Sequence, residues 1–145
     1  LIQGSQRAIL GPMALTRRPG NYFVNVIAMP VGRQSLDSGA DESAIEILLS
    51  LEMDHMRELV LEVPQRLIGH SRPDQSAHRA AASSTLLDAL MRLVALARSR
   101  QDALVLWPVI RTEIYYRLLT DVYGWQLVRA ALNPDRTGHA RQTGA

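Results

Sequence analysis

The spacing of apolar residues changes near residue 53, and this change limits the folds open to the chain. Upstream, apolar and β-branched residues form short runs without helical periodicity, separated by turn-forming residues. Downstream, apolar residues recur every three or four positions, as they do on one face of an α-helix. Because strands come first and helices follow, the sequence predicts an α+β domain and not an alternating parallel one.

The N-terminal third is predicted to form a small antiparallel meander or partial barrel. Gly11-Pro12 predicts a turn that joins a strand within residues 1–10 to a returning strand at residues 13–16, and Pro19-Gly20-Asn21 predicts a second turn. Three further strands are expected from their aromatic, β-branched and other apolar residues. They cover residues 22–27, 31–36 and 44–51.

The second predicted helix is the most apolar one. It covers residues 86–97, after Thr85 and Asp88 at the spacing of a capping box. Asp88 and Arg92 alone interrupt its apolar surface. A helix that is apolar on nearly every side needs more than one packing partner. Those partners are either other elements of the same domain or a second subunit.

Three further helices complete the predicted helical part. The first covers residues 53–63 and ends at Pro64. The third follows a break at residues 99–102 and is expected to hold Pro108 in its first turn, where proline is tolerated. A shorter fourth helix ends near Leu132. Residues 69–82 are expected to form a loop that can hold a helical turn near Ala80.

Composition is consistent with one folded soluble domain. The chain has 145 residues, of which 47% are hydrophobic and 21% charged, and no apolar run approaches the roughly 18 residues of a membrane span. The absence of cysteine excludes disulfides, thiolate metal sites and a cysteine nucleophile. The chain has neither an initiator methionine nor a visible signal peptide, so we expect it to begin inside a longer protein.

Charge is unevenly distributed along the chain. All 16 basic residues are arginine, which we attribute to genomic base composition and not to a phosphate-binding design. Residues 1–36 contain four arginines and no acid, whereas residues 37–62 hold eight of the 14 acids. A ligand bound by the first third is therefore expected to be anionic or neutral and polar.

No catalytic signature is visible, and neither a metal nor another cofactor is expected. The four histidines fall on predicted helices, loops or the tail, away from the strands that would supply ligands inside a barrel. They are His55, His70, His78 and His139. His55 follows Asp54 and is expected to be a surface residue of a first helical turn, in preference to a catalytic base.

Polar residues on the predicted strands give two interpretations. Gln3, Ser5 and Arg7 share one strand face, and Asn25 is polar within the apolar strand that Tyr22 begins. These side chains either face solvent, as one face of an antiparallel sheet commonly does, or converge on a small ligand pocket. The candidate ligand-binding residues are Gln3, Arg7, Tyr22 and Asn25.

The third helix carries a polar triplet that helix formation does not require. On a wheel of about 100° per residue, Glu113, Tyr116 and Arg117 lie together on the other side of Ile110 from Ile114 and Leu118. Glu113 and Arg117 stand four residues apart with the acid first, a pair that stabilises a helix by about 0.2–0.5 kcal/mol. Spacing alone favours a solvated face.

Several blocks, taken in order, make the chain similar to the N-terminal domain of AraC-type transcriptional regulators. The most specific block is the helix with Glu113-Ile114 and Tyr116-Arg117-Leu118-Leu119. The other blocks are Leu1-Ile2-Gln3-Gly4-Ser5-Gln6-Arg7, Pro19-Gly20-Asn21-Tyr22, Met29-Pro30-Val31, Leu86-Leu87-Asp88-Ala89-Leu90 and the segment from Pro108 to Leu119. The chain departs from the family at Gln6, where a basic residue is usual, and at Arg111, where an acid is common. Arg111 lies among apolar neighbours and needs a partner.

The resemblance implies a small cupin-like barrel followed by helices, which senses an unidentified small-molecule effector and forms homodimers in the bacterial cytoplasm. It also implies that DNA is bound only through a C-terminal domain outside this chain, and it gives Glu113, Tyr116 and Arg117 a structural or interdomain role. We expect one regulatory domain over residues 1–132, with a β-rich part at 1–52, a helical part at 53–132 and a flexible tail or linker at 133–145. The alternatives are a metal-free cupin-like enzyme and a pure oligomerisation domain.

Overall fold

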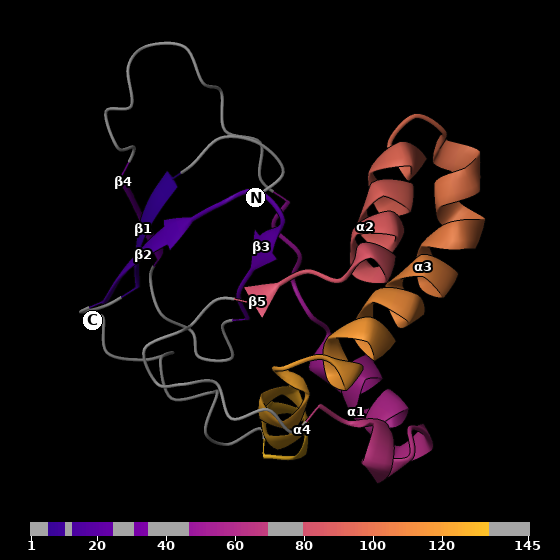
Figure 1. The fold of residues 1–145 in the computed structure, drawn as a ribbon. Helices are drawn as coiled ribbons and strands as arrows, with labels where there is room; N and C mark the ends of the chain where they lie inside the picture. The colour runs from indigo at the N-terminus through magenta and orange to yellow at the C-terminus, as the bar shows by residue number, and fades with distance from the viewer. Residues whose placement is uncertain (1–5, 11–12, 25–30, 35–46, 70–79, 134–145) are drawn as a thin grey trace, which may run out of the picture. The chain divides into compact units, whose positions relative to one another are not determined.

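The structure is a computed structural model that describes residues 6–10, 13–24, 31–34, 47–69 and 80–133. The chain divides into two compact units. The first unit contains Leu1–Ser50, Asp74–Ala81 and Asn133–Ala145, and the second contains Leu51–Pro73 and Ala82–Leu132. Strands belong to the first unit and helices to the second, so the predicted α+β class is confirmed (Figure 1). The division into a single domain over residues 1–132 stays a prediction.

The first sheet of the β unit has three antiparallel strands in the order β2-β1-β4. β1 (Gln6–Leu10) and β2 (Met13–Arg17) form the predicted hairpin, with a register that runs from Gln6 opposite Arg17 to Leu10 opposite Met13. β4 (Val31–Gln34) pairs with the other edge of β1. The strand predicted at residues 31–36 is confirmed as far as Gln34, and its last two residues lie outside the described part.

The second sheet is a pair of two-residue strands, β3 (Asn21–Tyr22) and β5 (Ala80–Ala81). The predicted turn precedes it: the Asn21 backbone N–H donates to the Arg18 carbonyl oxygen at 3.1 Å, and Gly20 has a φ of 73°, which glycine tolerates best. The helical turn expected near Ala80 is wrong, because the backbone of Ala80 pairs with Tyr22.

Two other predicted strands are shorter than expected or missing. The strand predicted at residues 22–27 ends after Tyr22, since Phe23 and Val24 have no strand conformation, and residues 25–27 are not described. Residues 47–51 were expected to complete a strand from residue 44 and have no regular structure. They keep an alternation of half-buried and exposed residues, but no described strand pairs with them. The described strands make two small sheets, and the predicted cupin-like barrel is not seen among them.

The helical unit begins with α1 (Met53–Glu62), which buries Met56, Leu59 and Val60. This helix confirms the prediction, and it ends just before Pro64, whose ring would clash with a preceding turn of helix. A 3-10 turn, η1 (Gln65–Leu67), follows. The Arg57 Nε donates to the Ala131 carbonyl oxygen at 2.9 Å and so joins α1 to the last helix, α4 (Gly124–Leu132).

α2 (Ser84–Leu96) and α3 (Arg100–Thr120) form an antiparallel hairpin (Figure 1). Ser83 caps α2, its Oγ accepting from the Leu86 N–H at 3.2 Å, so the cap lies two residues before the predicted Thr85. α3 also begins earlier than expected, because the Ser99 side chain caps it inside the segment predicted to be a break. Pro108 therefore lies in the helix interior, not in the first turn as predicted.

The junction between α3 and α4 depends on two glycines. The Gly69 N–H donates to the Leu119 carbonyl oxygen at 2.9 Å, and the Gly69 carbonyl oxygen accepts from the Trp125 N–H at 3.1 Å. A Cβ at Gly69 would lie 1.7 Å from the Asp121 carbonyl oxygen, and one at Gly124 would lie 1.9 Å from the Leu119 carbonyl oxygen. Neither position has room for a side chain, because the obstructing atoms belong to the backbone.

We expect Gly124→Ala to lower the free energy of unfolding by about 3 kcal/mol or more, the upper range for forced overpacking. Gly20→Ala is the matched control, because a Cβ there meets nothing within 4 Å. The free energy of unfolding should fall only by the cost of a positive φ at alanine, about 1–2 kcal/mol. Urea unfolding followed by circular dichroism measures both. A Gly124→Ala protein as stable as the wild type would contradict this packing.

Candidate functional site

The predicted ligand-binding residues are only partly within the described structure. Gln3 and Asn25 lie outside the described residues. Arg7 belongs to β1, where its backbone is opposite Thr16 and Gln34, and Tyr22 belongs to β3 of the other sheet. Tyr22 is half-buried and its hydroxyl oxygen is shielded from solvent. The described part of the chain therefore does not bring the four residues into one site, and their role as a pocket stays a prediction.

The polar triplet of α3 meets a residue of α2 that sequence spacing did not indicate. The Arg92 Nη2 donates to the Glu113 Oε2 at 2.6 Å, and the Arg117 Nη2 lies 3.7 Å from the Glu113 Oε1. The Arg117 guanidinium also lies 5.8 Å from the centroid of the Tyr116 ring. Glu113 thus bridges the two helices of the hairpin, which fixes the rotation of α2 relative to α3. Its partner lies 21 positions earlier in the chain, beyond the reach of periodicity within one helix.

A second polar cluster holds the start of α1 against α3. The Glu52 N–H donates to the hydroxyl oxygen of buried Tyr115 at 2.7 Å, and the Arg111 Nη1 donates to the Glu52 Oε1 at 2.6 Å. Arg111 has the partner that its apolar surroundings require. Burial raises the pKa of Tyr115, while the hydrogen bond from Glu52 acts in the opposite direction. The cluster satisfies an N–H at the helix start that no side chain of the local sequence caps.

His55 also takes part in the contact between α1 and α3. Its Nε2 lies 2.9 Å from the Thr112 Oγ1, and the Thr112 hydroxyl in turn donates to the Pro108 carbonyl oxygen at 2.9 Å. Its ring centroid lies 5.5 Å from that of Tyr115. The side chain is 23% exposed, so His55 lies in the first turn of α1 as expected, but half-buried.

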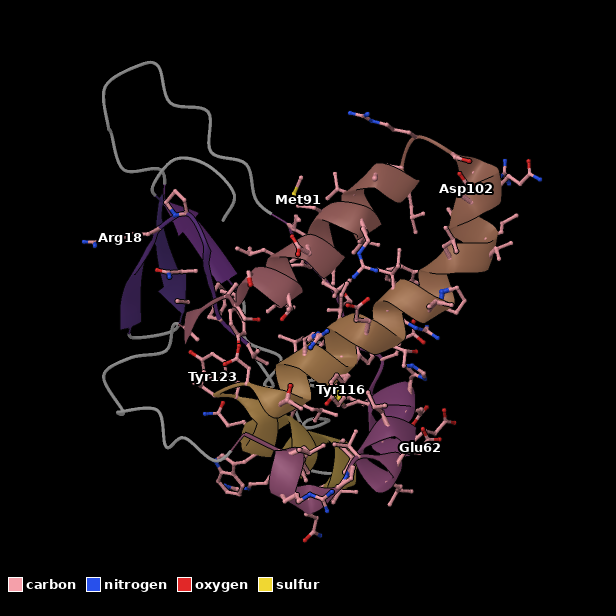
Figure 2. The ribbon with its side chains drawn as sticks, turned by 45° about the vertical axis from the view of Figure 1, so that its right-hand side comes forward. Arg18, Glu62, Met91, Asp102, Tyr116 and Tyr123 are labelled. Atoms are coloured by element: carbon pink, nitrogen blue, oxygen red, sulfur yellow. The ribbon has the colours of Figure 1, made fainter. Side chains whose placement is uncertain are left out.

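Several large apolar side chains of the α2–α3 hairpin are exposed within the helical unit. Buried residues of the hairpin include Leu86 and Ala89 on α2 and Ile110 and Ile114 on α3. Seven large apolar side chains remain exposed on the two helices, and Figure 2 shows one of them, Met91, pointing away from α3. The seven are Leu87, Met91, Val94, Leu104, Val105, Leu106 and Val109. Clustered exposed apolar side chains mark interaction surfaces.

Neither a metal-binding cluster nor a membrane-crossing helix is found among the described residues. Among them, no three histidine or acidic side chains come together in a way that could hold a metal ion. No helix in the described ranges is long and apolar enough to cross a membrane.

In a comparison with known protein families, the chain matches the family described as the AraC-type transcriptional regulator N-terminus over residues 1–126. The chain belongs to this family. The resemblance found in the sequence is confirmed, and membership assigns the chain to the regulatory part of AraC-type transcriptional regulators. No curated protein and no solved structure matches the chain.

The bridge between the hairpin helices gives a testable coupling. In a double-mutant cycle on Arg92→Ala and Glu113→Ala, we expect a coupling free energy of about 0.5–1 kcal/mol, the range for partly exposed ion pairs with good geometry. Arg92→Ala combined with Asp102→Ala is the control and should be additive. Chemical denaturation measures each variant, and equal coupling in both cycles would contradict a specific Arg92–Glu113 bridge.

Tyr115→Phe tests the second cluster. The variant keeps the ring and removes only the oxygen that accepts from the Glu52 N–H, so we expect the free energy of unfolding to fall by about 1–2 kcal/mol. Tyr116→Phe is the matched control, because the Tyr116 hydroxyl is not an acceptor for α1. Hydrogen exchange of the Glu52 amide provides the second readout. Unchanged protection of that amide would show that Tyr115 does not hold the start of α1.

Proposed function

We propose that this chain is the effector-sensing and self-associating regulatory domain of an AraC-type transcriptional regulator that acts in the cytoplasm. In this proposal a small molecule binds the β unit and two copies meet through the helical unit. DNA is contacted by a C-terminal helix-turn-helix domain outside this chain. The observation that carries the proposal is the group of exposed apolar side chains on the α2–α3 hairpin in a member of this family. Regulators that pair on DNA need such a surface, since a two-fold operator is read by two subunits.

For the β unit, we propose a cupin-like barrel whose polar strand residues bind the effector. The candidate residues are Gln3, Arg7, Tyr22 and Asn25. Two observations support this choice: residues 1–36 carry four arginines and no acid, and the shielded hydroxyl of Tyr22 lies on a strand. An anionic or neutral polar effector suits this charge distribution. We further propose that Tyr116 and Arg117 face the C-terminal domain, on the side of α3 that Glu113 shares.

Thermal-shift screening against carboxylates, sugar phosphates and neutral sugars tests effector sensing. A ligand present at about 100 times its dissociation constant stabilises the folded state by about 2.7 kcal/mol, which raises Tm by several degrees. Arg7→Ala and Asn25→Ala should abolish the shift, whereas Arg18→Ala, which removes an exposed arginine of the same region, should preserve it. A shift that survives Arg7→Ala and Asn25→Ala would contradict the proposed pocket, and no shift with any class would favour a pure oligomerisation domain.

A further inference from the structure

α3 contains two features that bend helices, and they lie in consecutive turns. Pro108 has no N–H, so the Leu104 carbonyl oxygen receives no hydrogen bond from it, and the proline ring crowds that oxygen. The Thr112 hydroxyl donates to the Pro108 carbonyl oxygen at 2.9 Å. Such a bond from a threonine to the carbonyl four residues earlier often bends a helix. The angle between the two halves of α3 is therefore set between Leu104 and Thr112.

α1 contacts this bend through His55. Its Nε2 lies 2.9 Å from the Thr112 Oγ1, the same oxygen that contacts the Pro108 carbonyl oxygen. A threonine hydroxyl carries one proton. Thr112 can therefore donate to His55 or to Pro108, but not fully to both at once.

We propose that His55 controls the bend of α3 by competing with the Pro108 carbonyl oxygen for the Thr112 proton. When the Nε2 of His55 carries no proton, it accepts from Thr112, and the bond to Pro108 is weakened. When Nε2 carries a proton, it donates to Thr112, whose own proton then goes to Pro108. The first state relieves the bend and the second strengthens it. This inference depends on neither effector binding nor self-association.

The groups around His55 make the competition sensitive to pH. On α1, the Glu58 Oε2 lies 3.6 Å from the Nδ1 of His55 and favours a proton there, so Nε2 is the acceptor in the neutral ring. On α3, the centroid of the Tyr115 ring lies 5.5 Å from that of His55, and Arg111 is paired with Glu52. Histidines typically gain a second ring proton between about pH 8 and pH 5. Acidification should therefore strengthen the bend.

The part of the hairpin that can follow the bend is its tip. The bridge from Arg92 to Glu113 joins α2 to the half of α3 that follows the proline, and so holds the base of the hairpin. The tip consists of the end of α2, the turn after it and α3 up to Trp107. It carries three apolar side chains that are exposed within the helical unit, Leu104, Val105 and Leu106. A change of the bend moves these three side chains together.

Distances between two spin labels measure the bend, and the natural chain is suited to labelling because it has no cysteine. Glu62→Cys and Gln101→Cys place the labels at exposed positions on either side of the bend. Figure 2 shows Glu62 and Asp102, the neighbour of Gln101, at opposite ends of the helical unit. Gln101 lies about 10 Å along the helix from Pro108, so a change of about 20° moves it by on the order of 3 Å. Double electron–electron resonance resolves such a change.

We expect Thr112→Val and His55→Phe to shift this distance in opposite directions from the wild-type value at pH 8, and to differ by on the order of 3 Å. Thr112→Val removes the bond to Pro108, whereas His55→Phe keeps an aromatic ring and removes the competitor. Thr120→Val is the matched control and should cause no shift. The Thr120 hydroxyl donates to the Tyr116 carbonyl oxygen at 3.0 Å in the same helix, beyond the proline and His55.

Acidification gives the second readout. Between about pH 8 and pH 5, the wild-type distance should move toward that of His55→Phe. Thr112→Ser keeps the hydroxyl and should respond as the wild type does, whereas Thr112→Val should not respond. Circular dichroism checks that each variant is folded. A wild-type distance that does not change with pH, or shifts of the same sign in Thr112→Val and His55→Phe, would overturn the inference.

Discussion

The two halves of α3 are buried to very different extents, and the arrangement of the helical unit depends on this difference. The second half supplies Ile110, Ile114, Tyr115, Leu118 and Leu119 to a core shared with α1 and α4, and Gly69 and Gly124 let the connecting segments approach closely enough to close it. The first half has α2 as its neighbour and leaves Leu104, Val105, Leu106 and Val109 exposed. Burying large apolar side chains stabilises a fold by about 1.5–3 kcal/mol each. The hairpin is therefore anchored in the core at one end and carries exposed apolar side chains along the rest of its length.

Two ion pairs hold α3 against its neighbouring helices and so set the rotation of α2 and α1 relative to α3. Arg92 and Glu113 hold α2 against α3, while Glu52 and Arg111 hold α1 against the opposite side of α3. Each pair is partly exposed and individually contributes little stability. Together they determine which side chains point outward.

Sequence reasoning predicted the elements whose signals are local. The change of period near residue 53, the proline at the end of α1 and the turn at Pro19-Gly20 all act within a few residues, and the structure contains each of them. Contacts between distant residues were missed: Arg92 with Glu113, the pairing of Ala80 with Tyr22, and the contact of the His55 ring with the Tyr115 ring. Pro108 was misplaced because Ser99 caps the helix nine residues earlier, so the helix starts inside the segment that was expected to break it. The polar triplet identified the family, but spacing could not reveal what Glu113 binds.

We infer that the helical unit carries a surface for a second copy of the chain. Sedimentation equilibrium of the wild-type protein, from low micromolar to several hundred micromolar, tests this inference most directly. We expect a reversible monomer–dimer equilibrium with a dissociation constant on the order of micromolar or weaker. A single species of monomer mass across the whole range would contradict it.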